Sequence, residues 1–259
     1  MLLWLLYGLL ILTVGSFSAA YTVRWPAKFD YLCSKEAHEY LSIHFEKPPP
    51  HYLSQTRSHC PCCNHRLLWI DLLPVISFTF LKGMCRYCKQ HISYRYPLIE
   101  CLHLACCFPL IWLYDDPYQL ALLTMLVSSL ITAAIIDGEH GLIPDECTVI
   151  VLMCALLLHL YVGTLNISVM GMLSGYGVII MLRWMYFKYR KIEGIGLGDA
   201  KLVAALGAWL GLTKLAPLLL CASLGGMLYT LLLGKNNPKQ LAFGPFLIVS
   251  ALLVYIFLL

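Results

Sequence analysis

The sequence predicts an all-α polytopic membrane protein with about eight transmembrane helices and a polar loop between the first two. Of the 259 residues, 60% are hydrophobic and 12% are charged, whereas a soluble domain carries about 25% charged residues. The apolar residues form long runs, and a membrane helix needs about 20 mostly apolar residues. The basic residues are also distributed unevenly between the connections. The apolar runs are 2–20, 98–114, 118–136, 147–163, 167–187, 200–212, 215–233 and 241–259.

The first and the sixth runs need separate comment. No Lys or Arg precedes Arg24, and a secretory signal peptide carries positive charge before its apolar region. We therefore expect the run 2–20 to be an uncleaved membrane anchor. The run 200–212 is short and contains Gly207 and Gly211, and we still expect it to form one of the eight crossings.

The positions of Lys and Arg predict the orientation of these helices. Ten lie in 21–97, five in 183–201 and two in 234–240, and Lys214 completes the 18 of the chain. With eight crossings, only Lys214 lies on the side opposite to the others. Because basic residues collect on the cytoplasmic side, we expect the N-terminus outside. The predicted domains are a first transmembrane helix (1–20), a cytoplasmic loop domain (21–97) and a transmembrane domain of about seven helices (98–259).

The loop 21–97 contains two Cys-x-x-Cys pairs, Cys60 with Cys63 and Cys85 with Cys88. This spacing is typical of a structural zinc site with four thiolate ligands, and a reducing cytoplasm disfavours disulfides. The alternative is that these cysteines are merely buried thiols. Cys62 offers a competing ligand, but the spacing selects Cys63. The apolar segment between the pairs is expected to pack on the membrane surface or on the zinc site, and not to cross the membrane.

Two carboxylates at the predicted cytoplasmic ends of crossings are candidates for chemistry. Asp137 ends one run and Asp199 begins another, between the glycines of GLGDAK, Gly196 and Gly198. Asp145 follows Pro144 and has a structural role available at a helix N-terminus. Two facing carboxyls share a proton, so one can activate a water while the other donates a proton to a peptide carbonyl. A transporter also uses acids in its membrane helices, and the residues alone leave both readings open.

Taken together, the motifs resemble those of the type IV prepilin peptidases. The segment 60–100 is similar to the zinc loop of that family, DGEHGLIPD at 137–145 to its first aspartate motif, and GLGDAK at 196–201 to the GxGD motif of intramembrane aspartyl proteases. FGPF at 243–246 matches a motif of the last crossing. The resemblance implies that Asp137 and Asp199 are the catalytic pair, and that Gly196, Gly198, Lys201, Pro144 and Asp145 are supporting motif residues.

The resemblance also implies the reaction and its surroundings. Such an enzyme sits in the bacterial inner membrane among lipids, with a periplasmic N-terminus and a cytoplasmic active site. It cleaves the leader of a prepilin or pseudopilin after a glycine, and it methylates the new N-terminus from S-adenosylmethionine. Gly83 matches a glycine that is linked to methylation, and no nucleic-acid partner is expected. The N-terminal motif departs from the family pattern at Ala19, so a protease without methylation is one alternative. A zinc-bearing transporter or scaffold is another.

Overall fold

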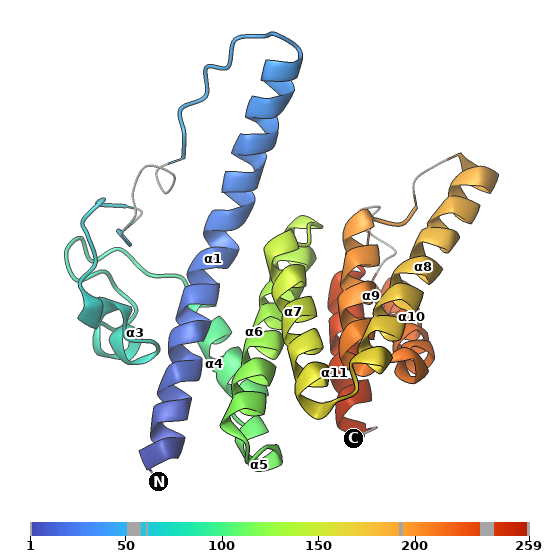
Figure 1. The fold of residues 1–259 in the computed structure, drawn as a ribbon. Coiled ribbons are helices and arrows are strands. Elements are labelled where there is room, and N and C mark those ends of the chain that lie inside the picture. Colours follow the sequence, from blue (N-terminus) through green and yellow to red (C-terminus); the bar gives the residue numbers. More distant parts are fainter. Residues whose placement is uncertain (1, 51–57, 61, 192–193, 234–240, 258–259) are drawn as a thin grey trace. The chain divides into compact units, whose positions relative to one another are not determined.

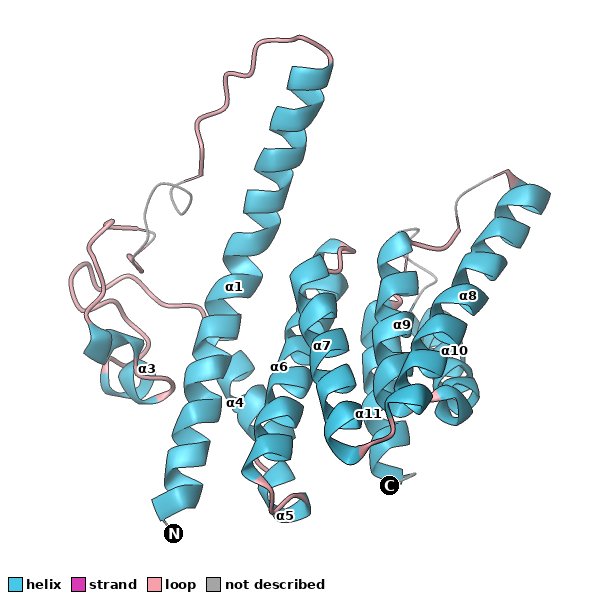
Figure 2. Ribbon diagram, in the orientation of Figure 1, coloured by secondary structure: helices cyan, strands magenta, loops and turns pink. Residues whose placement is uncertain are grey.

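Helices account for most of the chain. The computed structural model describes residues 2–50, 58–60, 62–191, 194–233 and 241–257. Within these ranges the structure consists of helices, turns and loops, with two isolated β-bridges and no strands (Figure 2). The predicted all-α class is therefore confirmed. The predicted cytoplasmic connection 234–240 lies outside the described residues.

The chain divides into two compact units, Met1–Ile111 and Trp112–Leu259. The first contains α1 (Leu2–Tyr40), the short 3₁₀ helix η1 (Trp69–Leu72), α3 (Ile76–Phe80) and α4 (Arg95–Cys107), and α5 (Leu110–Leu113) crosses the boundary. The second contains α6 (Pro117–His140), α7 (Asp145–Val162), α8 (Leu165–Arg190), α9 (Leu197–Leu210), α10 (Leu212–Leu233) and α11 (Gly244–Phe257).

In the first unit, the expected anchor 2–20 is only the first half of α1, which continues as a helix to Tyr40 (Figure 1). The polar half contains good helix formers and the ion pair Lys35–Glu39, one helical turn apart with N and O atoms at 3.6 Å, a spacing that supports a helix. The predicted boundary at residue 97 falls within the first turn of α4, and α4 packs on α1 within the first unit.

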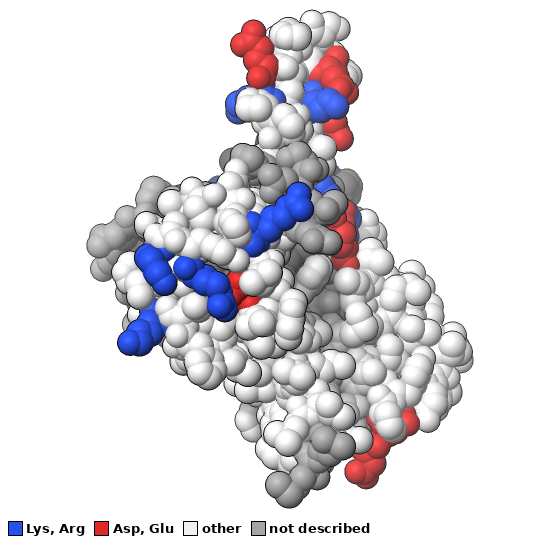
Figure 3. All heavy atoms as spheres, turned by 90° about the vertical axis from the view of Figure 1, so that its left-hand side faces the viewer, with Lys and Arg blue, Asp and Glu red and all other residues white. Residues whose placement is uncertain are grey.

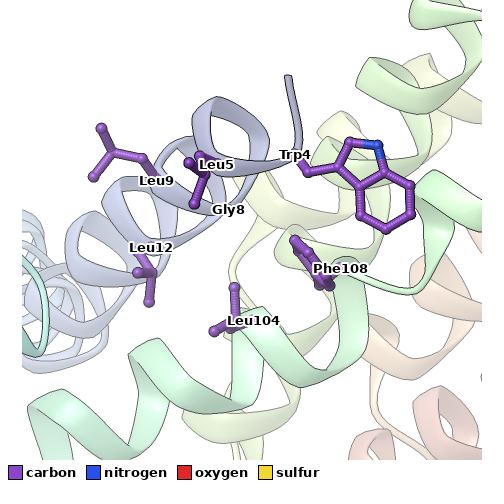
Figure 4. A pocket seen from close by; sticks show the side chains of 7 residues that line it. All are labelled: Trp4, Leu5, Gly8, Leu9, Leu12, Leu104 and Phe108. Carbon is purple, nitrogen blue, oxygen red and sulfur yellow. The ribbon is translucent and has the colours of Figure 1, made fainter. Parts of the chain in front are cut away.

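The N-terminal end of α1 and the C-terminal end of α4 leave an apolar hollow of about 750 Å³ between them (Figure 4). Its lining includes Trp4, Leu104 and Phe108, and the Trp4 and Phe108 rings meet edge to face. Close by, the Tyr7 hydroxyl donates to the Cys107 carbonyl at 3.0 Å. The open side of this helix pair is thus apolar, as expected for a surface in contact with lipid.

In the second unit, α9 is the central helix. Ten of its 14 residues are buried, and α7, α8, α10 and α11 all contact it. The closest approach is to α8, where a Cβ atom on Gly171 would overlap the carbonyl oxygen of Gly207 and the reverse also holds. The Ser168 hydroxyl donates to the Ala208 carbonyl at 2.7 Å across the same contact. Small residues thus let the two backbones touch, as at many helix contacts in membranes.

Six helices within the described ranges are long and apolar enough to cross a membrane, namely α1, 95–113, α6, α7, α8 and α10, and α11 is a shorter apolar helix. A multi-pass helical membrane protein is therefore confirmed. The run 200–212 forms α9, whose 14 residues extend for only about 21 Å, less than the ~30 Å of a bilayer core. The count of eight crossings stays a prediction.

Candidate active site and metal centre

Asp137 lies in the last turn of α6, which ends because Gly141 adopts a left-handed conformation with φ of +67°. The side chain is 4% exposed, and its Oδ2 accepts a hydrogen bond of 2.9 Å from the backbone N–H of Gly244. A Cβ atom on Gly244 would lie 2.5 Å from the same oxygen. The first residue of α11 must therefore be a glycine for this contact to form.

Asp199 is the third residue of α9 and lies one turn after Gly196, which is the N-cap. Its carboxyl group accepts a hydrogen bond from the Gly196 backbone N–H, which is the side chain to N-cap half of a capping box. The Asp199 carboxyl also lies close enough to Asp137 for the charge of one to act on the other. The structure therefore brings together two carboxyl groups that are 62 positions apart in the sequence.

Ile143, in the connection between α6 and α7, fills the space beside the two carboxyls. A Cβ atom on Gly198 would lie 3.5 Å from the Cβ of Ile143, and one on Gly244 would lie 3.3 Å from its Cδ1. The same side chain therefore packs against glycines next to both aspartates. The isoleucine of the DGEHGLIPD segment and the glycines of GLGDAK and FGPF form one apolar wall of the site.

The FGPF segment is held by α10. Phe246 packs on the backbone of Gly225, where a Cβ atom would lie 3.3 Å from its ring, and its ring contacts Tyr229. Pro245 approaches Gly138, the residue after Asp137, with 3.7 Å between the proline Cγ and a Cβ placed on the glycine. Packing on α10 and α6 thus fixes the start of α11 beside Asp137.

Asp145 and Lys201 form an ion pair outside the aspartate pair. Lys201 Nζ lies 2.7 Å and 2.8 Å from the two Asp145 carboxylate oxygens, and both side chains are about half exposed. Asp145 is the first residue of α7 after the N-cap Pro144, as its place in the sequence suggested. The pair joins the start of α7 to α9, two residues after Asp199.

Two carboxyl groups with interacting charges, one buried and one half-buried, are suited to moving protons. Repulsion favours a state in which one is ionised and the other protonated. An ionised carboxylate can take a proton from water while its protonated partner gives one to a carbonyl oxygen. The arrangement therefore has the groups that peptide hydrolysis by an aspartate pair requires.

The two Cys-x-x-Cys turns of the first unit have the same pattern of backbone hydrogen bonds. In one, the Cys60 N–H donates to His65 O at 2.9 Å and Asn64 N–H donates to Cys60 O. In the other, the Cys85 N–H donates to Gln90 O at 2.8 Å and Lys89 N–H donates to Cys85 O. The residue after the second cysteine, Asn64 or Lys89, has a φ of +58° in each turn.

These turns bring the sulfur atoms of Cys60, Cys63, Cys85 and Cys88 within 4.8 Å of one another. The Cys60 and Cys88 sulfurs are 3.8 Å apart, close to the about 3.8 Å edge of a tetrahedron with zinc–sulfur bonds of about 2.3 Å. Backbone N–H groups of Cys88 and Tyr87 bond to the Cys85 sulfur and lower its pKa to about 7. The four cysteines therefore fit a tetrahedral metal ion, and Cys62 is not part of this group.

Gly83, predicted to lie at the methyl-donor site, has a structural reason to be a glycine. Its φ is +69°, and a Cβ atom would lie 3.0 Å from the Phe78 ring. Its N–H donates to Phe78 O at 2.8 Å, and its carbonyl accepts from Ile92 N–H at 2.7 Å. Gly83 thus closes the turn between α3 and Cys85.

Sequence reasoning did not assign a role to Gly244 or Ile143. Both lie inside motifs that the sequence presents, FGPF and DGEHGLIPD, but neither has a side chain that performs acid–base chemistry. Their roles come from a backbone N–H and from packing, which depend on how distant helices meet. The available signal in the sequence was the glycine of FGPF, which has a phenylalanine before it and a proline after it.

Two family profiles match the chain. The bacterial peptidase A24 N-terminal domain matches residues 9–114, nearly the extent of the first unit, and the type IV leader peptidase family matches residues 124–231. No solved structure matches the chain.

Curated relatives match over nearly the whole length. The chain is 35% identical to the prepilin leader peptidase/N-methyltransferase of Dichelobacter nodosus, over 96% of this chain and 90% of that protein. It is 37% identical to the protein of the same name from Dickeya chrysanthemi, over 95% and 90%. It is 33% identical to that of Aeromonas hydrophila, over 95% and 89%. The chain therefore belongs to the type IV leader peptidase family.

Proposed function

We infer that this protein is a prepilin leader peptidase and N-methyltransferase of the bacterial inner membrane. The observation that carries the peptidase activity is the meeting of Asp137 and Asp199, with Gly244 N–H bonded to Asp137. The relatives of the same name support both activities, and the apolar helices support the membrane location.

We propose that Asp137 and Asp199 hydrolyse the peptide bond that follows the leader. One carboxylate takes a proton from water, and the water oxygen attacks the carbonyl carbon while the other carboxyl gives its proton to the carbonyl oxygen. The tetrahedral intermediate then collapses, the carbon–nitrogen bond breaks, and the amine leaves with a proton returned through the pair. The resemblance to the family favours a glycine before this bond. Gly198 and Gly244 have no side chains, which lets Ile143 and the Asp137 carboxyl group approach their backbones closely.

We propose that the new amine is then methylated at its nitrogen. S-adenosylmethionine would supply the methyl group, and the cytoplasmic loop is our candidate for its site, with Gly83 at the turn beside it. The amine must lose a proton before it accepts the methyl group, so the transfer site needs contact with water or with a base.

Zinc is our candidate for the ion at the four-cysteine centre. Four thiolates are a structural set without an open position, so the ion would tie the two turns together and take no part in either reaction. Cys60, Cys63, Cys85 and Cys88 would hold it.

We propose the orientation of the protein in the membrane from the distribution of its basic residues. The loop carries exposed Arg66, Lys82, Arg86 and Lys89, and Figure 3 shows Lys and Arg side chains gathered on the loop face of the first unit. Basic residues favour the cytoplasmic side, which places the N-terminus in the periplasm. The substrates would be prepilins or pseudopilins, whose apolar N-terminal helices reach the site from the lipid, and no nucleic acid takes part.

Mass analysis of a co-expressed prepilin tests these proposals together. With the wild-type enzyme the client should lose its leader and gain the mass of one methyl group. With Asp137→Asn or Asp199→Asn it should keep its leader. A client that is cut but never methylated would restrict the enzyme to proteolysis. A client that is uncut by the wild-type enzyme, in membranes where the protein is present, would contradict the proposed function.

A further inference from the structure

Glu100 is a carboxylic acid within the apolar run 98–114, on α4. It is 5% exposed, and burying an unpartnered carboxyl group is costly. The backbone of α1 lies directly against it, because a Cβ atom on Gly15 would be 3.1 Å from the Glu100 Cα. Neither the aspartate pair nor the four cysteines account for this residue.

Two other segments of the first unit bond to the Glu100 carboxyl group. The Ser16 hydroxyl of α1 donates to it, and the backbone N–H of Val75 donates to its Oε2 at 2.8 Å. Val75 belongs to the loop and precedes α3. One buried side chain therefore joins α1, α4 and the loop, three segments that are well separated in the sequence.

The backbone at Val75 is unusual. Its φ is 56° and its ψ is −43°, a region in which a β-branched residue is an outlier. The Ile76 N–H bonds to the Pro74 carbonyl, so Val75 is the centre of a three-residue turn close to the rare classic γ form. Such a conformation persists only where its surroundings hold it, and Glu100 supplies a bond to the central N–H.

A short path leads from this turn to the metal centre. Ile76 begins α3, and Phe78 of α3 both accepts the Gly83 N–H at 2.8 Å and covers the face of Gly83 with its ring. Cys85 follows two residues later. The orientation of the second metal-binding turn relative to α1 and α4 therefore depends on the γ-like turn at Val75 and on the carboxyl group that holds it.

We propose that Glu100 is a positioning residue that fastens the metal-binding loop to α1 and α4, and that methyl transfer depends on this attachment whereas leader cleavage does not. The part of this proposal that concerns methyl transfer rests on the proposed function, in which the loop takes part in methylation. The aspartate pair belongs to the other unit, where it has a hydrogen bond and packing contacts of its own, so hydrolysis has its own supports.

The test compares Glu100→Ala, Glu100→Gln and the control Thr22→Val in the full-length protein, reconstituted in lipid. Glutamine keeps an oxygen that can accept the Val75 N–H and an amide that can donate to Ser16. Thr22 is a buried residue of α1 whose hydroxyl donates to the Ala19 carbonyl of its own helix. Four quantities are measured on each: bound metal, amide exchange over 73–81, prepilin cleavage and methyl incorporation.

In Glu100→Ala we expect amide exchange over 73–81 to rise about tenfold, because the loop loses a buried hydrogen bond. Methyl incorporation should fall by a similar factor, while metal content is kept and cleavage stays within about twofold of wild type. Glu100→Gln should restore most of the exchange protection and of the methylation, because its amide oxygen can accept the Val75 N–H in place of the carboxylate. Thr22→Val should match the wild type.

Unchanged exchange in Glu100→Ala would overturn the attachment, and so would a Gln variant as damaged as the Ala variant. Equal loss of cleavage and methylation would overturn the separation of the two steps. If the wild-type enzyme does not methylate its client at all, the proposed function fails, but the exchange comparison still decides whether Glu100 fastens the loop.

Discussion

In the metal-binding loop, each pair of cysteines is arranged by a turn of six residues whose hydrogen bonds are local. At the aspartate pair, the contacting groups come from α6, α9, α11 and the connection before α7, and Asp137 bonds to a residue 107 positions away. The geometry of the metal-binding loop therefore depends on local turns and on the ion that its cysteines bind, whereas the geometry of the aspartate site depends on helix packing. Substitutions should damage them in different ways.

The largest effect is expected at the metal ligands. Structural zinc can contribute on the order of 10 kcal/mol to the folding of a small domain, so Cys85→Ser should release the ion and make the loop sensitive to protease. Cys62→Ser is the matched control, because Cys62 is outside the four-sulfur group. Metal content and limited proteolysis measure the outcome. Equal metal loss from both variants would show that the ligand set is wrong.

Replacing either aspartate should remove cleavage and leave the loop intact. An amide neither accepts nor donates the required proton, and acid–base groups contribute about 10²- to 10⁴-fold to rates. Asp137→Asn and Asp199→Asn are compared with Asp115→Asn, an exposed acid in the connection before α6. Cleavage rate and metal content are measured on each variant. Full cleavage by Asp199→Asn would remove that residue from the catalytic pair.

A methyl group between α8 and α9 should disturb the aspartate site from a distance. Gly171→Ala places a Cβ against the Gly207 backbone, whereas Gly177→Ala on the same helix meets nothing within 4 Å. Overpacking costs about 1–3 kcal/mol, so Gly171→Ala should lower the thermal midpoint and the cleavage rate, and Gly177→Ala should do neither. Indistinguishable variants would mean that the α8–α9 contact does not position Asp199.

The smallest effect is expected at the Asp145–Lys201 ion pair. Exposed pairs contribute about 0.2–1 kcal/mol, so Asp145→Asn should keep substantial cleavage activity. A double-mutant cycle with Lys201→Met, read out by thermal unfolding, should give a coupling energy in that range, and it should weaken as salt is added. Complete loss of cleavage in Asp145→Asn would instead make it a third essential carboxyl.

The contrast between local cysteine turns and a site formed by distant helices also explains which features could be predicted from the sequence. The helical membrane class agrees with the expectation from composition and family resemblance, and the four cysteine sulfurs are grouped as their spacing predicts. The structure brings Asp137 and Asp199 close together, and their catalytic role stays a prediction. Cys-x-x-Cys turns are local, so spacing alone indicates their geometry. The apolar run 2–20 does not indicate that α1 continues to Tyr40, because the second half of this helix is polar.

Other features could not be predicted because they depend on contacts between distant residues. Nothing near Glu100 in the sequence indicates that it accepts the N–H of Val75. The pairing of Asp145 with Lys201 likewise requires the start of α7 to lie beside α9. In the same way, α9 has the composition of a membrane crossing, but its enclosure by four other helices is a property of the packed unit.

The bond between Asp137 and Gly244 also has a consequence for biosynthesis. A ribosome that adds about 5–20 residues per second needs about 5–20 s to make the 107 residues that separate them. Until α11 is made and packed on α10, Asp137 lacks its amide partner and one wall of the site is missing. The nascent chain thus enters the membrane with an incomplete aspartate site, and on the proposed function hydrolysis begins only after this late helix is in place.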